Sequence, residues 1–132
     1  MILVDTSVLI DYFRGADNKV IDRFNEIIGK KIPFGINNYI YQEVLQGAAS
    51  EKDFKSLKEY LGTQLFYGLQ NATESHENAA RLYFRCRKNG LTIKSTIDFL
   101  IAETAIENKL MLLHNDYDFT SMARIIKELK IC

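Results

Sequence analysis

The sequence has little that would tie it to a membrane or to a strongly charged partner. Its 132 residues include 17 Lys and Arg against 17 Asp and Glu, so the formal net charge is zero. No global charge therefore attracts nucleic acid or an anionic membrane, and any such binding depends on local patches. No apolar run approaches the ~18 residues of a membrane span, and the N-terminus lacks the basic region of a secretory signal. We expect a soluble, unprocessed protein.

Cysteines and phosphate-binding glycine loops are also scarce. The two cysteines are Cys86 and Cys132, and a domain with 47% hydrophobic residues does not need a disulfide for stability. We expect both thiols to be reduced and the protein to be cytoplasmic. The sequence has no Gly-rich phosphate loop, and Ser7 lacks the glycine-flanked turn of a hydrolase nucleophile. Because no linker, repeat or low-complexity segment occurs, residues 1–132 are predicted to form a single domain.

The opening stretch, residues 1–12, predicts a buried strand, a sharp turn and a helix. Ile2 to Val4 form a continuous apolar run, and the apolar residues after Ser7 recur at helical spacing. In open α/β sheets, ligands bind beyond the carboxyl ends of the strands, which is where Asp5 would lie. Thr6 or Ser7 can cap the helix that follows. Asp5 can instead be an ordinary N-cap with no other role.

Further short apolar segments alternate with amphipathic helical patterns along the chain. Such alternation predicts a three-layer α/β/α sandwich with a central, mainly parallel sheet of four or five strands. A polar connection is expected at residues 71–75, before a helix that ends at Asn89 and Gly90. The remaining strand candidates are residues 32–36, 64–69 and 110–113, with a short edge strand at 129–132.

Four acidic residues occupy positions that this topology would bring to one edge of the sheet. Asp5 and Asp116 follow strands, Glu43 lies in a helix after a strand, and Asp98 falls in the first turn of a helix. Carboxylates that lie so close together raise one another's pKa values unless a cation compensates their negative charges. Oxygen ligands without a Cys or His cluster favour Mg²⁺ or Mn²⁺, which points to phosphoryl-transfer chemistry with a metal-activated water.

Each acid also has an ordinary structural interpretation. Glu43 and Asp98 can be solvated helix residues, and an acid in a first turn gains from the helix dipole without any catalytic role. Asp118 can replace Asp116 as the functional acid, or either can form an Asx-turn around Tyr117. His76 and His114 invite a general-base role, but a metal-bound water removes the need for one.

Two surface features allow a similar choice between a functional and a structural role. A basic cluster at residues 81–88 can contact RNA phosphates, although we interpret it as a solvated helix face. Several aromatic side chains can stack on bases or line a groove for a protein partner, although most should belong to the core. These aromatic residues are Phe13, Tyr39, Tyr41, Phe54 and Tyr60.

The order and spacing of four stretches resemble a PIN domain, and more closely the VapC toxins of bacterial and archaeal toxin–antitoxin pairs. The stretches are residues 4–11, the helix around Glu43, residues 98–102 and residues 112–119. The resemblance implies that the family's four acids are Asp5, Glu43, Asp98 and Asp116, with Asp118 as a possible fifth ligand and Thr6 and Ser7 as supporting residues. His114 departs from the family, which commonly has Thr or Ser at that position.

The resemblance further implies a Mg²⁺-dependent endoribonuclease, with Mn²⁺ as a possible substitute, that cuts tRNA, rRNA or mRNA. It implies a homodimer held inactive by a cognate VapB-like antitoxin, whose C-terminal segment lies in a groove beside the active site, and which alone contacts operator DNA. Two other functions stay open: a non-catalytic PIN-fold binding domain, and an aspartyl-phosphate phosphatase with Asp5 as nucleophile. The phosphatase needs a second Asp two residues later, where this chain has Ser7.

Overall fold

The computed structural model describes all residues from 1 to 132 and contains one sheet of five parallel strands. The strand order is β3-β2-β1-β4-β5, which confirms the predicted sheet. The strands are short, and their bounds are β1 Ile2–Val4, β2 Phe34–Ile36, β3 Leu65–Phe66, β4 Met111–Leu113 and β5 Lys130–Ile131.

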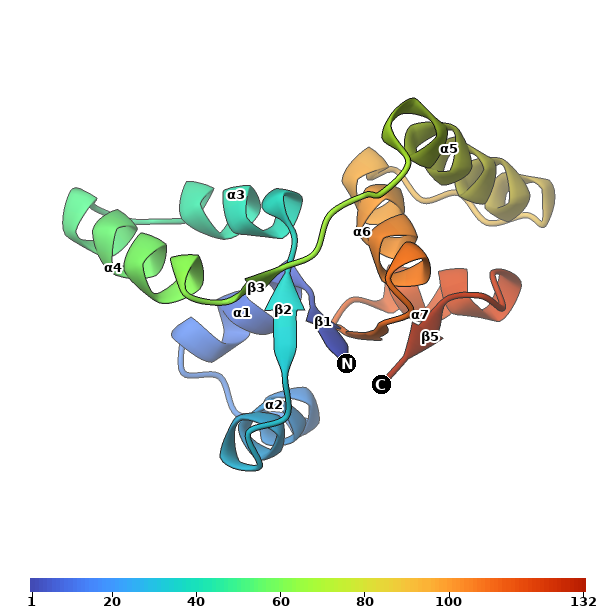
Figure 1. Ribbon diagram of the computed structural model, residues 1–132. Helices are drawn as coiled ribbons and strands as arrows, with labels where there is room; N and C mark the ends of the chain where they lie inside the picture. The colour runs from blue at the N-terminus through green and yellow to red at the C-terminus, as the bar shows by residue number, and fades with distance from the viewer.

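Seven helices cover the two faces of the sheet. Helices α1 to α4 gather on one side and α5 to α7 on the other, so the molecule has the predicted three layers (Figure 1). The chain reverses its direction across the sheet at β3, which is why the later helices cover the opposite face. The bounds are α1 Thr6–Phe13, α2 Lys19–Gly29, α3 Asn38–Gln46, α4 Glu51–Gly62, α5 Ala72–Lys88, α6 Thr96–Glu107 and α7 Tyr117–Ile125.

The central strand β1 fixes the edge at which the acidic residues gather. It pairs with β2 on one side and with β4 on the other, and Val4 lies opposite Leu113. Val4 and Leu113 are almost fully buried, as expected for a parallel strand covered on both faces. Because all strands run in the same direction, Asp5 and the residues after Leu113 leave the sheet at one edge.

Helix α6 is buried on several sides rather than along a single apolar stripe. Every residue from 99 to 105 is buried, because α6 packs against α5 and also contacts α3 and β4. Two buried polar side chains join it to the start of α3: Asn37 Nδ2 donates to Thr104 Oγ1 over 3.2 Å. Thr104 Oγ1 in turn donates to the Leu100 carbonyl. These bonds hold the helix that carries Asp98 against the layer that carries Glu43.

Two predicted element boundaries are wrong. Strand β3 has two residues rather than six, because the chain turns toward α6 after Tyr67, and Asn108 Nδ2 donates to the Gly68 carbonyl. Residues 72–75, predicted as part of a connection, are the first turn of α5. Ser75 is buried there and its hydroxyl donates to Glu107 Oε1, a contact that no local sequence signal reveals.

The remaining general expectations concern the thiols and the helices. Cys86 is buried and Cys132 is half-buried, and neither forms a disulfide. No helix combines the length and the apolar character needed to cross a membrane.

Candidate metal centre

Three carboxylates converge at the carboxyl edge of the sheet. One oxygen from each of Asp98, Asp116 and Asp118 lies within 4.8 Å of the other two. Asp98 comes from the first turn of α6, whereas Asp116 caps α7 and Asp118 lies in the first turn of α7. Oxygen ligands of one Mg²⁺ at about 2.1 Å lie about 3 to 4 Å apart, so modest side-chain movement brings these three onto one cation.

Asp5 is buried beside this group, with 4% of its surface exposed. Its Oδ2 accepts hydrogen bonds from the Ser7 amide over 3.1 Å and from the Ser7 hydroxyl over 2.7 Å. Asp5 is therefore the N-cap of α1, and the expectation that Thr6 or Ser7 takes that role is wrong. Burial raises the pKa of Asp5, and the charge of Asp116 acts in the same direction, while the Ser7 bonds oppose both.

Glu43 lies in α3 and is held by Thr6, whose hydroxyl donates to Glu43 Oε1 over 2.8 Å. Glu43 is not among the three carboxylates with the closest oxygens. Its charge still acts on Asp98. Of the two residues predicted to support the site, Thr6 thus contacts Glu43 and Ser7 contacts Asp5.

The electrostatics at Asp98 show that the acids act on one another. Burial raises the pKa of Asp98 to about 7, and the charges of Asp5, Asp116, Glu43 and Asp118 add to the effect in that order. Neither ion pair in the structure involves these residues, because the pairs are Lys30 with Glu26 and Arg85 with Glu128. No protein cation therefore forms an ion pair with the group, and its side-chain donors are all hard oxygens, a donor set that fits Mg²⁺ or Mn²⁺.

His114 does not supply the missing positive charge. Burial lowers the pKa of its imidazole, against the opposing charges of Asp5 and Asp116. Its Nδ1 accepts a hydrogen bond from the Asp116 amide over 3.2 Å, and its ring packs against Phe119 at 5.4 Å. His114 is thus a packed, hydrogen-bonded residue just after the end of β4.

The two acids around Tyr117 do not exclude each other. Asp116 Oδ1 accepts a hydrogen bond from the Asp118 amide over 2.9 Å, which is the Asx-type turn expected from the sequence. Both carboxylates nevertheless belong to the converging group.

A second set of polar contacts, which the sequence did not reveal, holds the loop between β4 and α7. The Asn115 amide donates to Ser7 Oγ over 2.9 Å, and Asn115 Nδ2 donates to Asp11 Oδ2 over 2.7 Å. Ser7 and Asp11 are four residues apart and share one face of α1, which is a visible signal. Their partner lies more than 100 residues away, so no local pattern could identify it.

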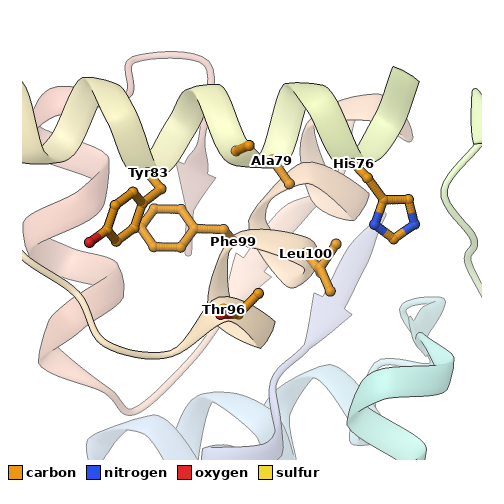
Figure 2. A pocket seen from close by; sticks show the side chains of 7 residues that line it. His76, Ala79, Tyr83, Thr96, Phe99 and Leu100 are labelled. Atoms are coloured by element: carbon orange, nitrogen blue, oxygen red, sulfur yellow. The ribbon is translucent and has the colours of Figure 1, made fainter. Parts of the chain in front are cut away.

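An apolar cavity of about 310 Å³ lies between α5 and α6, apart from the carboxylates (Figure 2). His76, Tyr83 and Phe99 are among its lining residues, and none of the seven is an acid. The cavity side of α6 is formed by Thr96, Phe99 and Leu100. The acidic side chains therefore lie at the sheet edge and not in this cavity.

The sheet order and the carboxylate edge define an α/β domain with a candidate site for a divalent cation. The chain belongs to the PIN domain family, whose model matches residues 2–125.

The family relationship extends to named relatives and solved structures. The chain is 29% identical over 126 residues to ribonuclease VapC11 of Mycobacterium tuberculosis, covering 95% of this chain and 93% of the relative. The VapC ribonuclease Mb1587 of Mycobacterium bovis matches to the same extent. These matches confirm the resemblance to VapC toxins.

Solved structures of VapBC proteins have the same fold. VapBC2 of Rickettsia felis, bound to a promoter DNA fragment, aligns with a TM-score of 0.76 and 18% identity, covering 100% of this chain and 98% of that one. VapBC-1 of nontypeable Haemophilus influenzae aligns with a TM-score of 0.73 and 21% identity, covering 100% and 97%.

Proposed function

We propose that this protein is a Mg²⁺-dependent endoribonuclease that acts as the toxin of a toxin–antitoxin pair. The observation that carries the proposal is the convergence of Asp98, Asp116 and Asp118 without a neighbouring protein cation. The similarity to VapC ribonucleases supports RNA as the substrate.

In this proposal, Asp98, Asp116 and Asp118 hold the cation, with Asp5 and Glu43 completing the acidic site. Mn²⁺ can substitute for Mg²⁺, because both prefer oxygen ligands. When bound, the cation supplies an activated water and offsets charge on the phosphodiester. Thr6 and Ser7 orient the Glu43 and Asp5 carboxylates through the hydrogen bonds described above. The five acids thus form the catalytic residues of the proposed enzyme.

The side chains near the site argue against the aspartyl-phosphate alternative. A nucleophilic Asp5 would have to reach substrate, but only 4% of its surface is exposed and Ser7 engages its Oδ2 twice. Ser7 also occupies the position at which that mechanism needs a second Asp. Neither histidine is required as a base, since His114 Nδ1 already accepts a hydrogen bond from the Asp116 amide and His76 lines the α5–α6 cavity.

The proposed biological setting is the cytoplasm, in a complex with a VapB-like antitoxin that contacts operator DNA. The similarity to VapBC complexes supports this partner. Phe13 and Phe54 are exposed on α1 and α4, and Phe13 packs edge-on against Tyr60 at 5.4 Å. We propose this aromatic surface as part of the groove that receives the antitoxin, and we propose that the toxin is a homodimer.

The central experiment measures Mn²⁺ binding by calorimetry and RNA cleavage with Mg²⁺ for the wild type and for Asp98→Asn. We expect the variant to lose most metal uptake and cleavage, because it removes one carboxylate from the converging group. Asp22→Asn is the matched control, since Asp22 lies in the first turn of α2 and is exposed. Cleavage by Asp98→Asn at the wild-type rate, or cleavage that persists in a chelator, would refute the proposal.

A second experiment tests the toxin role. Induced expression should arrest growth, and co-expression of a small DNA-binding protein encoded beside the gene should restore growth. Expression of Asp5→Asn should not arrest growth, even when the DNA-binding protein is absent. Metal uptake without any RNA cleavage would instead favour the non-catalytic binding domain.

A further inference from the structure

Tyr117 is the most exposed large apolar side chain in the protein, with 68% of its surface accessible. The exposed aromatic residues Phe13 and Phe66 pack edge-on against other rings. Tyr117 has no aromatic partner. It stands between Asp116 and Asp118, two members of the converging carboxylate group. An uncovered aromatic ring therefore borders the candidate metal centre.

Arg124 holds the Tyr117 ring in place along α7. The guanidinium carbon lies 5.7 Å from the ring centroid, and Arg124 Nη1 donates to the Tyr117 hydroxyl over 3.3 Å. Arg124 forms no ion pair with a carboxylate. Because most of the ring stays exposed, Arg124 covers at most one of its faces. Tyr117 thus offers a free aromatic face, and Arg124 on the ring carries a charge that no carboxylate pairs.

We propose that Tyr117 is the stacking platform for the RNA base that flanks the phosphodiester held at the carboxylate group. The inference rests on the proposed function and assigns a binding residue to it. Tyr117 is the residue between Asp116 and Asp118 at the start of α7, which brings its exposed ring within reach of a nucleoside next to a phosphate held there through a cation. Aromatic rings bind every base through its flat face, and Arg124 complements the negative charge of an adjacent phosphate.

The choice of RNA over a protein partner follows from the surroundings of Tyr117. No aromatic ring packs against Tyr117, Arg124 contacts it, and the residues on either side of it in the chain are acids. A protein partner that covered it would have to desolvate the neighbouring carboxylates, which is costly without matched cations. A nucleotide bound through a cation complements both the acids and the ring, because the cation offsets the carboxylate charges and the base stacks on Tyr117.

The first test uses fluorescence, because the wild-type chain contains no tryptophan. Tyr117→Trp introduces a single tryptophan at the proposed platform. With Mn²⁺ bound and the tryptophan emission read by stopped flow before cleavage, a short single-stranded RNA with all four bases should quench that emission. An abasic ribose-phosphate oligomer of equal length should not. Absent quenching, or equal quenching by both oligomers, would overturn the proposal.

The second test separates stacking from general apolar contact. Tyr117→Ala and Tyr117→Leu should each raise KM for RNA cleavage by roughly 5- to 150-fold, the range found when a stacking ring is removed. Tyr117→Phe should stay within about twofold, since it keeps the ring. Mn²⁺ affinity should be the same in all three variants. Phe84→Ala is the control, because Phe84 is an exposed aromatic side chain on α5.

The outcomes distinguish this inference from the proposed function. A wild-type protein that neither binds Mn²⁺ nor cleaves RNA defeats the proposed function. A wild-type protein that cleaves RNA while Tyr117→Ala cleaves equally well overturns only the stacking role. Restoration of KM by Tyr117→Leu would also overturn it, because leucine supplies apolar surface without a flat ring.

Discussion

Buried Glu103 and half-buried Glu107 form an acid pair whose titration should control stability. They lie one turn apart on α6, and Glu103 has 5% of its surface exposed. Glu107 Oε1 accepts from the Gln70 amide and the Ser75 hydroxyl, whereas Glu107 Oε2 is buried without a partner. A proton on Glu103 would supply that missing partner. Burial and Glu107 raise the pKa of Glu103 to about 8.

The pKa of Glu107 moves in the opposite direction. Burial pushes it upward, but hydrogen bonds from Glu103, Gln70 and Ser75 outweigh burial and lower it. The pair therefore shares one proton at neutral pH, with Glu103 as the donor.

The sign of the pH dependence follows from the proton held by the folded state. An ordinary Glu has a pKa of 4.5, against about 8 for Glu103 in the fold. The stability that Glu103 contributes is complete below pH 4.5, decreases as the pH rises toward 8, and is lost above it. At about 1.4 kcal/mol for each pH unit, the loss is on the order of 3 to 5 kcal/mol.

The assay is urea unfolding of the wild type and of Glu103→Gln, from about pH 5 to about pH 9, on both sides of the folded pKa. The amide of the variant still donates to Glu107 but cannot ionise. Its free energy of unfolding should therefore exceed that of the wild type increasingly as the pH rises. Glu77→Gln on α5 is the exposed control. Parallel pH profiles for the wild type and Glu103→Gln would refute the shared proton.

Three further predictions concern the site and the sheet. Asp98→Asn should raise the melting temperature of the metal-free protein, because it removes one of five mutually repelling acids. The variant should also lose the increase in melting temperature that Mn²⁺ gives the wild type. Thermal scans with and without Mn²⁺ check this, and equal stabilisation of both proteins by Mn²⁺ would contradict it. Asp11→Ala should weaken Mn²⁺ binding by about 10- to 100-fold in calorimetry, because it releases the loop that carries Asp116, whereas exposed Asp17→Ala should bind as the wild type does. Gly35→Ala should cost about 1 to 3 kcal/mol in urea unfolding, since its Cβ would lie 2.5 Å from the Tyr67 ring and 2.7 Å from the Leu65 carbonyl oxygen, and wild-type stability would show that both the ring and the backbone of β3 move aside freely.

Local sequence patterns predicted the sheet because its strands are continuous apolar runs that end abruptly in polar residues. The segments before Asp5 and before His114 are the clearest cases, and both became central strands of the sheet. The same patterns placed Asp98 in a first turn, which Ser95 caps through a hydrogen bond to the Asp98 amide. Each of these features depends on neighbours within a few residues, which a sequence displays directly.

Features that depend on distant partners could not be predicted in this way. The sequence did not show that Asp118, rather than Glu43, joins Asp98 and Asp116 in a group of oxygens within 4.8 Å of one another, because side-chain direction follows from how α6 and α7 pack. It also did not show that Ser75 begins a buried helical turn, since Glu107 lies 32 residues away. In both cases tertiary contacts decide between local alternatives of similar energy.

Asp5 shows why the structural and functional interpretations of one acid need not compete. Its amide donates to the Leu113 carbonyl over 2.9 Å, which fixes the end of β1 beside β4. Its Oδ2 caps α1 through Ser7. The same carboxylate lies near enough to the acidic group for its charge to act on Asp98. The cap anchors the side chain, and burial next to Asp116 makes its charge costly unless a cation is bound. The buried position from which Asp5 caps α1 is thus also the position at which its negative charge calls for a bound cation.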